Sequence, residues 1–131
     1  TTTLEFRSNV SGIWDNMGME IGELQSELRA FAAERYWEQF HTIKNLILAL
    51  TGEVGELAAT VQWLESVDLD ALNSDPKLRA AFNEEIADVF IYLLRLADVS
   101  QTNLIEVAKN KIEENAKRYT VEKSKGNARK Q

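Results

Sequence analysis

Apolar residues recur at every third or fourth position through most of residues 20–119, a spacing that places them on one face of an α-helix. The chain has one proline and only six glycines, too few for a fold built from many tight turns. The helical pattern divides into stretches at residues 20–39, 42–65, 76–99 and 103–119. The sequence therefore predicts an all-α, four-helix-bundle-like domain.

The borders of these stretches carry residues that suit helix ends. Thr42 and Thr102 are the expected N-caps, because a hydroxyl can accept a hydrogen bond from a free backbone N–H of the first turn. Asp75 and Pro76 predict a cap followed by the first helical residue, where the missing N–H of proline is harmless. Residues 66–75 are expected to form a polar connection.

The two ends of the chain lack the helical period. We interpret residues 1–18 as a poorly ordered, non-native leader and expect the natural start near Met19, which opens the periodic part. Residues 122–131 are rich in Lys, Arg and Gly and predict a basic flexible tail. The folded domain is therefore expected at residues 19–121.

The overall composition argues against several classes of protein. A net charge of -6 disfavours nucleic acid as a partner. The lack of cysteine excludes disulfides, thiolate catalysis and zinc–thiolate sites. No run approaches the roughly 20 apolar residues of a membrane-spanning helix, and no signal peptide is evident. We expect a cytoplasmic protein without a membrane partner.

Two pairs of carboxylates are the strongest functional signal: Glu53 with Glu56, and Glu85 with Asp88. Residues three apart lie on one face of a helix, and here that face is otherwise apolar. Anions on such a face are unfavourable unless a cation meets them. Two helices packed face to face would hold four carboxylates around a hard divalent cation, although either pair alone could also belong to a solvated helix face.

The donor set narrows the choice of ion. Carboxylates without sulfur suit Mg²⁺, with Mn²⁺ as the alternative. A di-iron bundle is disfavoured, because it uses Glu-x-x-His on two helices and this chain has a single histidine. Structural Ca²⁺ stays open, although carboxylates on helices lack the loop carbonyls typical of calcium sites.

Magnesium usually joins protein carboxylates to substrate phosphates and can activate a bound water, so the site suggests a phosphoanhydride substrate. Two groups of residues could contact the phosphates or the sugar. The first group lies on one face of the last predicted helix and consists of Lys111, Asn115 and Arg118. The second group is Lys44 and Asn45 at the start of a helix, where free N–H groups favour anions. Lys111 and Arg118 could equally form a solvated face.

Aromatic side chains could provide flat surfaces for a nucleobase. The candidates lie within one or two helical turns of the acidic pairs or of the helix start: Trp37, His41, Trp63 and Tyr92. Aromatic residues at helical spacing are more often part of a core. From Ile86 to Val99 the chain is apolar nearly all round, which predicts either a central helix or an oligomer interface.

Several segments together resemble one known family. They contain Glu-x-x-Glu, a distant Glu-x-x-Asp, a Trp-Glu-Gln-Phe-His box at residues 37–41 and an Asn-x-x-Arg-Tyr end at residues 115–119. In these motifs the chain resembles the MazG-like all-α NTP pyrophosphohydrolases, most closely the dCTP pyrophosphatase type. The resemblance covers about residues 24–126.

The resemblance implies hydrolysis of a nucleoside triphosphate, dCTP or a modified dCTP, to the monophosphate and pyrophosphate, with Mg²⁺, in sanitation of the nucleotide pool. It assigns the metal to the four carboxylates and the base pocket to the four aromatic candidates. It also implies a homodimer, or a tetramer made of two dimers, with sites between protomers. The alternative is a non-catalytic helical oligomer that binds nucleotide or metal as an interaction module.

Overall fold

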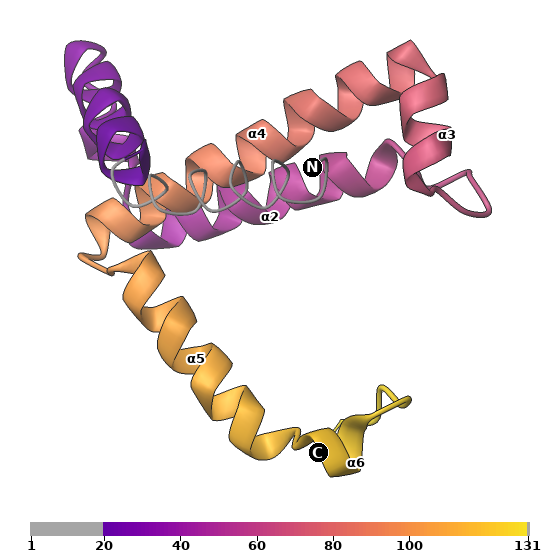
Figure 1. Ribbon diagram of the computed structural model, residues 1–131. Helices are drawn as coiled ribbons and strands as arrows, with labels where there is room; N and C mark the ends of the chain where they lie inside the picture. The colour runs from indigo at the N-terminus through magenta and orange to yellow at the C-terminus, as the bar shows by residue number, and fades with distance from the viewer. Residues whose placement is uncertain (1–19, 131) are drawn as a thin grey trace, which may run out of the picture. The chain divides into compact units, whose positions relative to one another are not determined.

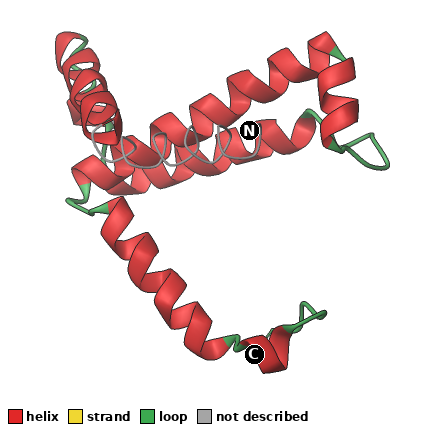
Figure 2. Cartoon of the chain, viewed as in Figure 1, coloured by secondary structure: helices red, strands yellow, loops and turns green. Residues whose placement is uncertain are grey.

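The computed structural model describes residues 20–130, and all regular structure in this range is helical, which confirms the all-α prediction (Figures 1 and 2). The predicted leader at residues 1–18 lies outside the described residues. The first helix covers residues 20–34, and the further elements are η1 (Glu38–Phe40), α2 (Ile43–Ala59), α3 (Leu69–Ser74), α4 (Pro76–Val99), α5 (Leu104–Arg118) and α6 (Val121–Ser124). Of these helices, none has the length and apolar character needed to cross a bilayer. Backbone contacts divide the chain after Ser100 into two units.

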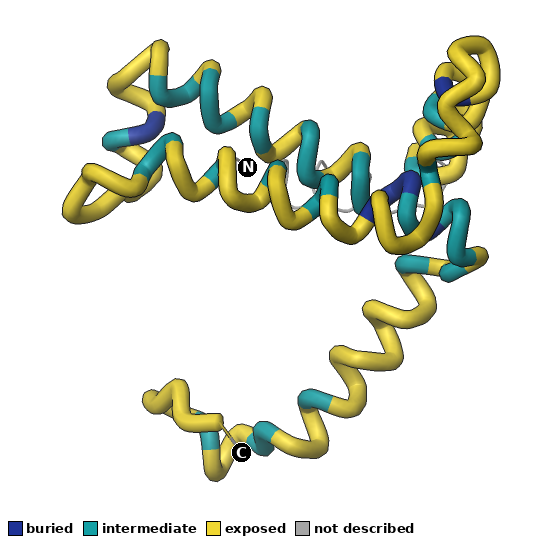
Figure 3. The backbone as a smooth tube through the Cα atoms, turned by 180° about the vertical axis from the view of Figure 1, so that it is seen from behind, coloured by how far each residue is buried: buried dark blue, intermediate teal, exposed yellow. Residues whose placement is uncertain are grey.

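The first unit is organised around α2 and α4, which run side by side in opposite directions with α3 at the turn between them (Figure 1). Leu46 of α2 and Leu94 of α4 are each 1% exposed, and Ala32 of the first helix is buried as well. Figure 3 shows most of the buried positions at the end of this helix pair that adjoins the first helix. Gln25 ties the first helix to α4, because its Nε2 donates a hydrogen bond to the Leu94 carbonyl over 3.3 Å.

Much apolar surface of the first unit stays uncovered. Within the described residues only five hydrophobic side chains are buried, whereas Phe31, Phe90 and Ile91 are 45%, 41% and 40% exposed. These three side chains join Leu24 and Leu28 around an open apolar cavity of about 390 Å³ between the first helix and α4. Such a contiguous patch is typical of a surface that another molecule covers.

The first helix ends at residue 34, so the prediction that it continues to residue 39 was wrong. Tyr36 adopts a left-handed backbone with a φ of 55°. Its N–H donates to the Ala33 carbonyl over 3.2 Å, and the N–H of Trp37 donates to the Ala32 carbonyl over 2.9 Å. This is a Schellman ending, which normally has glycine at the left-handed position. The chain turns there, and Trp37 comes to lie beside α4.

The left-handed Tyr36 leads to a prediction about stability. We expect Tyr36→Gly to stabilise the fold by about 1 kcal/mol, because a left-handed backbone costs a non-glycine residue roughly 1–2 kcal/mol. Part of this gain is offset, because glycine loses more conformational entropy on folding than tyrosine does. The tyrosine is 80% exposed, so little packing is lost. Thermal unfolding followed by circular dichroism should show a rise of about 4 °C. The matched control is Ala33→Gly in the helix, which should lower the melting temperature; a fall in both variants would contradict the prediction.

The end of α2 also differs from the prediction, because α2 stops at Ala59 instead of continuing to residue 65. The N–H of Thr60 donates to the Leu57 carbonyl over 3.2 Å, and the Thr60 hydroxyl donates to the same carbonyl over 2.7 Å. These short-range bonds replace the regular helical pattern with a tighter turn. Trp63 therefore lies beyond the helix, where it is 89% exposed.

The connection expected at residues 66–75 contains the short helix α3. Asp68 caps it, since its Oδ1 accepts a hydrogen bond from the Ala71 N–H over 2.8 Å, and Leu72 is buried at 8% exposure. The capping carboxylate and the buried leucine stabilise this short helix, which packs against α4. The sequence predicted a polar connection here but no helix within it.

Two predicted helix starts in the first unit are confirmed. The Thr42 hydroxyl accepts the N–H of Asn45 over 3.1 Å. Asp75 caps α4, and its Oδ1 accepts the N–H groups of Lys77 and Leu78, each over 3.1 Å. The span of α4 from Pro76 to Val99 is the predicted one.

The second unit consists of α5 and α6. The N-cap of α5 is Asn103, whose Oδ1 accepts the Glu106 N–H over 3.1 Å, so the expectation of Thr102 was wrong by one residue. The amide of Asn is a stronger cap than the hydroxyl of Thr. Beyond Tyr119 the chain forms α6, for which Thr120 is the cap. No helix was predicted there from the sequence.

Candidate metal centre

Three carboxylates from two helices meet in the first unit. Glu53 and Glu56 lie one turn apart on α2, and Glu85 comes from α4. Each of the three offers one oxygen, and these oxygens all lie within 4.8 Å of one another. The convergence follows from the sequence in two steps: spacing by three residues puts both α2 acids on one face, and the packing of α2 against α4 turns that face toward Glu85.

Two of the carboxylate oxygens are buried without a partner. Glu53 Oε2 and Glu85 Oε2 have no hydrogen-bond partner within residues 20–130 and almost no exposed surface. Burial raises the pKa of Glu53 to about 7, and the neighbouring carboxyls of Glu56, Asp88 and Glu85 contribute to the shift. The pKa of Glu85 is also raised, first by burial and then by Glu56. The cluster is therefore electrostatically unsatisfied by the protein groups around it.

Asp88, the predicted fourth ligand, lies near the cluster but is not one of the three converging acids. It is half-buried on α4, one turn after Glu85. Its charge raises the pKa of both Glu53 and Glu85, so it contributes to the same negative field. Its role as a ligand stays a prediction.

The residues present fit a hard divalent cation. All donors are carboxylate oxygens, and no sulfur or imidazole is among them. Buried oxygens without partners are expected to be strongly unfavourable as anions, and a cation would remove that cost. This chemistry suits Mg²⁺ or Mn²⁺ better than softer ions.

The raised pKa of Glu53 predicts how stability depends on pH. The folded chain holds this proton up to about pH 7, whereas an unfolded glutamic acid releases it at about pH 4.3. The folded state therefore binds more protons within this window, and its stability falls as the pH rises through it. In EDTA we expect the melting temperature to drop by roughly 4 °C between pH 5 and pH 8 on account of this group, and millimolar Mg²⁺ at pH 8 to restore it.

Other groups require a control in this experiment. The pKa of His41 is lowered by burial and by Arg95, so this residue changes stability in the opposite direction below about pH 6.5. The pKa of Asp98 is lowered mainly by its hydrogen bond to Arg29, and it titrates below the window. The difference between wild type and Glu53→Gln isolates the effect of Glu53. A difference that does not change with pH would contradict the prediction.

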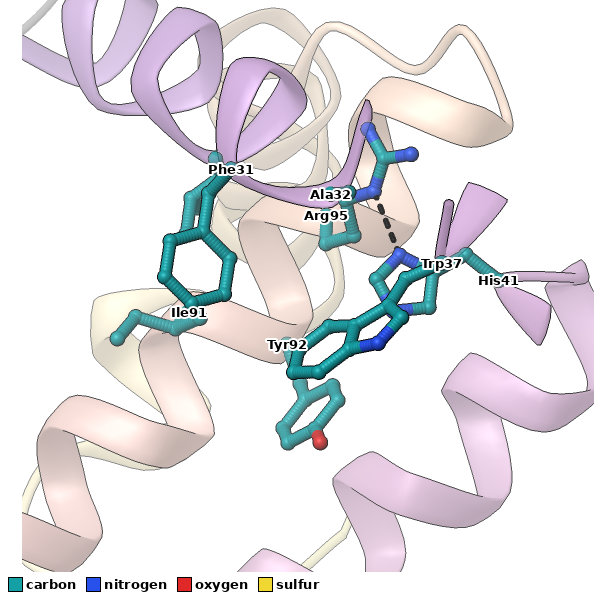
Figure 4. A pocket seen from close by; sticks show the side chains of 8 residues that line it. Phe31, Ala32, Trp37, His41, Ile91, Tyr92 and Arg95 are labelled. Carbon is teal, nitrogen blue, oxygen red and sulfur yellow. Dashed lines mark hydrogen bonds between the residues drawn. The ribbon is translucent and has the colours of Figure 1, made fainter. Parts of the chain in front are cut away.

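Three of the four aromatic candidates line one pocket (Figure 4). Trp37, His41 and Tyr92 come from the segment around η1 and from α4. The Trp37 indole meets His41 edge-on at 6.4 Å between ring centroids. The pocket encloses about 100 Å³. The rest of its lining is mostly apolar and consists of Leu28, Phe31, Ala32, Ile91 and Arg95. Trp63, the fourth candidate, does not line this pocket.

The predicted phosphate contacts belong to both units of the chain. Lys44 and Asn45 lie in the first turn of α2, where Asn45 Nδ2 donates to the Phe40 carbonyl over 3.0 Å. Lys111, Asn115 and Arg118 lie on α5 in the second unit. Lys111 Nζ is 3.4 Å from a carboxylate oxygen of Glu114, and an exposed ion pair of this kind is typical of a solvated helix face. The contacts of these residues with a ligand stay predictions.

Two charged residues beside the pocket are not among the predicted site residues. Arg95 and Asp98 interrupt the apolar run of α4 three residues apart, and Arg95 is buried. A buried arginine that forms an ion pair with an aspartate at this spacing is unusual in an apolar helix, so the interruption itself was a usable signal. Arg95 also contacts His41, which follows η1. Spacing in the sequence could not predict this contact, because the two residues are 54 positions apart.

Comparisons with known proteins agree with the motifs. The family model described as the MazG nucleotide pyrophosphohydrolase domain matches residues 41–120. The dCTP pyrophosphatase 1 of Mus musculus is 48% identical over 109 residues, which are 83% of this chain and 62% of the relative. For dCTP pyrophosphatase 1 of Homo sapiens the identity is 44% over 111 residues, which are 85% of this chain and 64% of the relative. The chain thus spans just under two thirds of the length of these curated relatives.

A solved structure is also similar. The crystal structure of a pyrophosphatase from Archaeoglobus fulgidus matches with a TM-score of 0.70 and 41% sequence identity, covering 77% of this chain and 93% of that chain. The resemblance predicted from the acidic pairs, the Trp-Glu-Gln-Phe-His box and the Asn-x-x-Arg-Tyr end is confirmed. The chain belongs to the MazG nucleotide pyrophosphohydrolase domain family.

Proposed function

We propose that the chain hydrolyses a deoxynucleoside triphosphate, dCTP or a modified dCTP, to the monophosphate and pyrophosphate in a reaction that depends on Mg²⁺, with Mn²⁺ as the alternative ion. The observation that carries the proposal is the convergence of Glu53, Glu56 and Glu85, with two buried oxygens that have no partner among the described residues. The preference for cytosine is supported by relatives named dCTP pyrophosphatase 1. The cellular role would be removal of unwanted nucleotides.

The four carboxylates would divide the chemistry among them. Glu53, Glu56, Glu85 and Asp88 would hold the ion, which when bound neutralises phosphate charge and acidifies water. A carboxylate oxygen that is left free would accept the proton of the attacking water, and Glu53 or Glu56 is our candidate. The Oε2 atoms of Glu53 and Glu85 have almost no exposed surface, and charge interactions of buried atoms are stronger than those in water.

The substrate would be held by residues outside the acidic cluster. The phosphates and the sugar are assigned to Lys44, Asn45, Lys111, Asn115 and Arg118. The base is assigned to the aromatic pocket of Trp37, His41 and Tyr92, with Trp63 as an additional contact. An apolar pocket with few polar groups is the usual form of a site for a flat heterocycle.

We further propose that the chain works as a homodimer or as a dimer of dimers, with four-helix packing that includes α2 and α4. Support comes from the large apolar surface that the first unit leaves exposed, including Phe31, Phe90 and Ile91. A domain of this length is expected to bury roughly two-thirds of its unfolded surface, which requires a larger core than these few buried side chains. The catalytic domain would be residues 19–121, followed by the basic tail.

The direct test is release of pyrophosphate from a panel of the common NTPs and dNTPs with Mg²⁺, and with EDTA as control. The proposal expects pyrophosphate and a monophosphate in equal amounts, highest turnover with dCTP or its 5-modified forms, and no turnover in EDTA. Binding of nucleotide without product would favour the non-catalytic module instead.

A further inference from the structure

Arg95 on α4 is the one charged side chain buried among the described residues, at 7% exposure. A buried guanidinium is unfavourable unless its charge is paired and its N–H groups are hydrogen-bonded. Arg95 is not a member of the metal centre, and it lines the aromatic pocket. Its contacts therefore indicate what it does for that pocket.

Arg95 belongs to a chain of charged groups that links two helices. Its Nη1 donates to Asp98 Oδ2 over 3.1 Å. Asp98 also accepts two hydrogen bonds from Arg29 of the first helix, at 3.0 Å from Nε and 2.6 Å from Nη2. Bidentate pairs of this kind fix the orientation of both partners. Asp98 therefore anchors Arg95 in one position.

The anchored Arg95 acts on His41. Its Nε donates to His41 Nδ1 over 3.0 Å (Figure 4). An imidazole nitrogen that accepts a hydrogen bond carries no proton, so the proton of the neutral ring must be on Nε2. The positive charge of Arg95 also opposes a second proton on the ring, as the lowered pKa of His41 reflects.

The second nitrogen of His41 is available to a ligand. Figure 4 shows the Nδ1 side of the ring turned toward Arg95. The indole of Trp37 lies beside the same ring, at 6.4 Å between centroids. Within residues 20–130 no protein group forms a hydrogen bond with His41 Nε2. The pocket that His41 shares with Trp37 and Tyr92 is otherwise mainly apolar, so a single oriented N–H stands out as the group that a ligand would meet.

We propose that Arg95, anchored by Asp98 and Arg29, is a positioning residue that holds His41 as a neutral ring with its Nε2–H available to donate a hydrogen bond to an acceptor on the edge of the bound nucleobase. This inference rests on the proposed function, in which the pocket takes the base. A fixed donor favours a carbonyl oxygen or an unprotonated ring nitrogen, such as O2 or N3 of cytosine. It disfavours an edge that presents N–H at the same place, such as N3–H of thymine or uracil.

The single histidine of the chain makes a direct test practical. Nitrogen-15 NMR of the full chain should show His41 neutral near pH 7, with the proton on Nε2, and adding deoxycytidine monophosphate with Mg²⁺ should shift the Nε2 signal. Arg95→Met should release the tautomer and raise KM for dCTP about 3- to 10-fold with little change in kcat, as loss of one oriented hydrogen bond predicts. Arg95→Lys should recover part of the effect.

The matched control is Arg79→Met, which removes an arginine from the same helix near Phe82. It should change neither the tautomer nor KM. If the wild type cleaves no triphosphate, the proposed function fails, and the NMR measurement still shows whether Arg95 fixes His41. If the wild type is active but His41 carries its proton on Nδ1, or Nε2 does not respond to saturating nucleotide, the positioning role is overturned. Should Arg95→Met fail to fold, the two wild-type NMR measurements decide alone.

Discussion

Glu53→Gln and Glu85→Gln should nearly abolish pyrophosphate release and yet make the chain more stable in EDTA. Each substitution removes a buried carboxylate oxygen that has no partner among the described residues, and it keeps the size of the side chain. Removing an unpaired buried charge stabilises a fold, whereas removing a proposed ligand of the metal ion should cost turnover. We expect a loss of at least about 100-fold in kcat and a rise of roughly 4 °C in melting temperature at pH 8. Mg²⁺ should stabilise the wild type more than either variant.

The neighbouring Glu84 provides a matched control. It is exposed and is not one of the three converging acids, so Glu84→Gln should alter neither turnover nor the melting temperature. Glu56→Gln and Asp88→Asn extend the test to the remaining predicted ligands and should also abolish turnover with the fold intact. Full activity in both would refute the assignment of the site. A lower melting temperature of Glu53→Gln in EDTA would show that its carboxylate is already satisfied by protein groups.

The meeting of Glu53 and Glu56 with Glu85 follows largely from local information in the sequence. Spacing by three residues places Glu53 beside Glu56 on any helix, whatever surrounds it. That Glu85 would face them needed one further step: the apolar stripes of the two helices had to pack against each other, and the buried Leu46 and Leu94 show that they do. Which oxygens end up buried and without a partner depends on side-chain positions, which no periodicity encodes.

Helix ends were harder to predict because the deciding groups are backbone atoms or weak caps. A glycine at position 36 would have signalled the end of the first helix, but Tyr36 takes the left-handed conformation with no such signal. The helix α3 rests on one capping aspartate and the buried Leu72, in a stretch whose composition is typical of a loop. The Arg95–His41 contact joins residues far apart in the sequence, so only the tertiary structure could show it.

Phe90→Glu should prevent the chain from associating. Phe90 lies on α4, 41% exposed, and lines the open apolar cavity together with Phe31 of the first helix. If a second copy covers this face, the substitution places a charge in an apolar interface, and association should weaken by at least about 30-fold. Sedimentation velocity over a range of concentrations would show a dimer or tetramer for the wild type and a monomer for the variant. Turnover should be lower in the monomeric variant, because the family resemblance implies sites between protomers.

The control for Phe90→Glu needs the same chemical change on another surface. Val121 of α6 is 77% exposed and lies in the second unit, so Val121→Glu should leave the oligomeric state unchanged. A wild type that sediments as a stable monomer at all concentrations would contradict the proposed assembly. It would also mean that the apolar face of the first helix and α4 is covered by another part of the protein or by a different partner, since a patch of this extent seldom remains in contact with water.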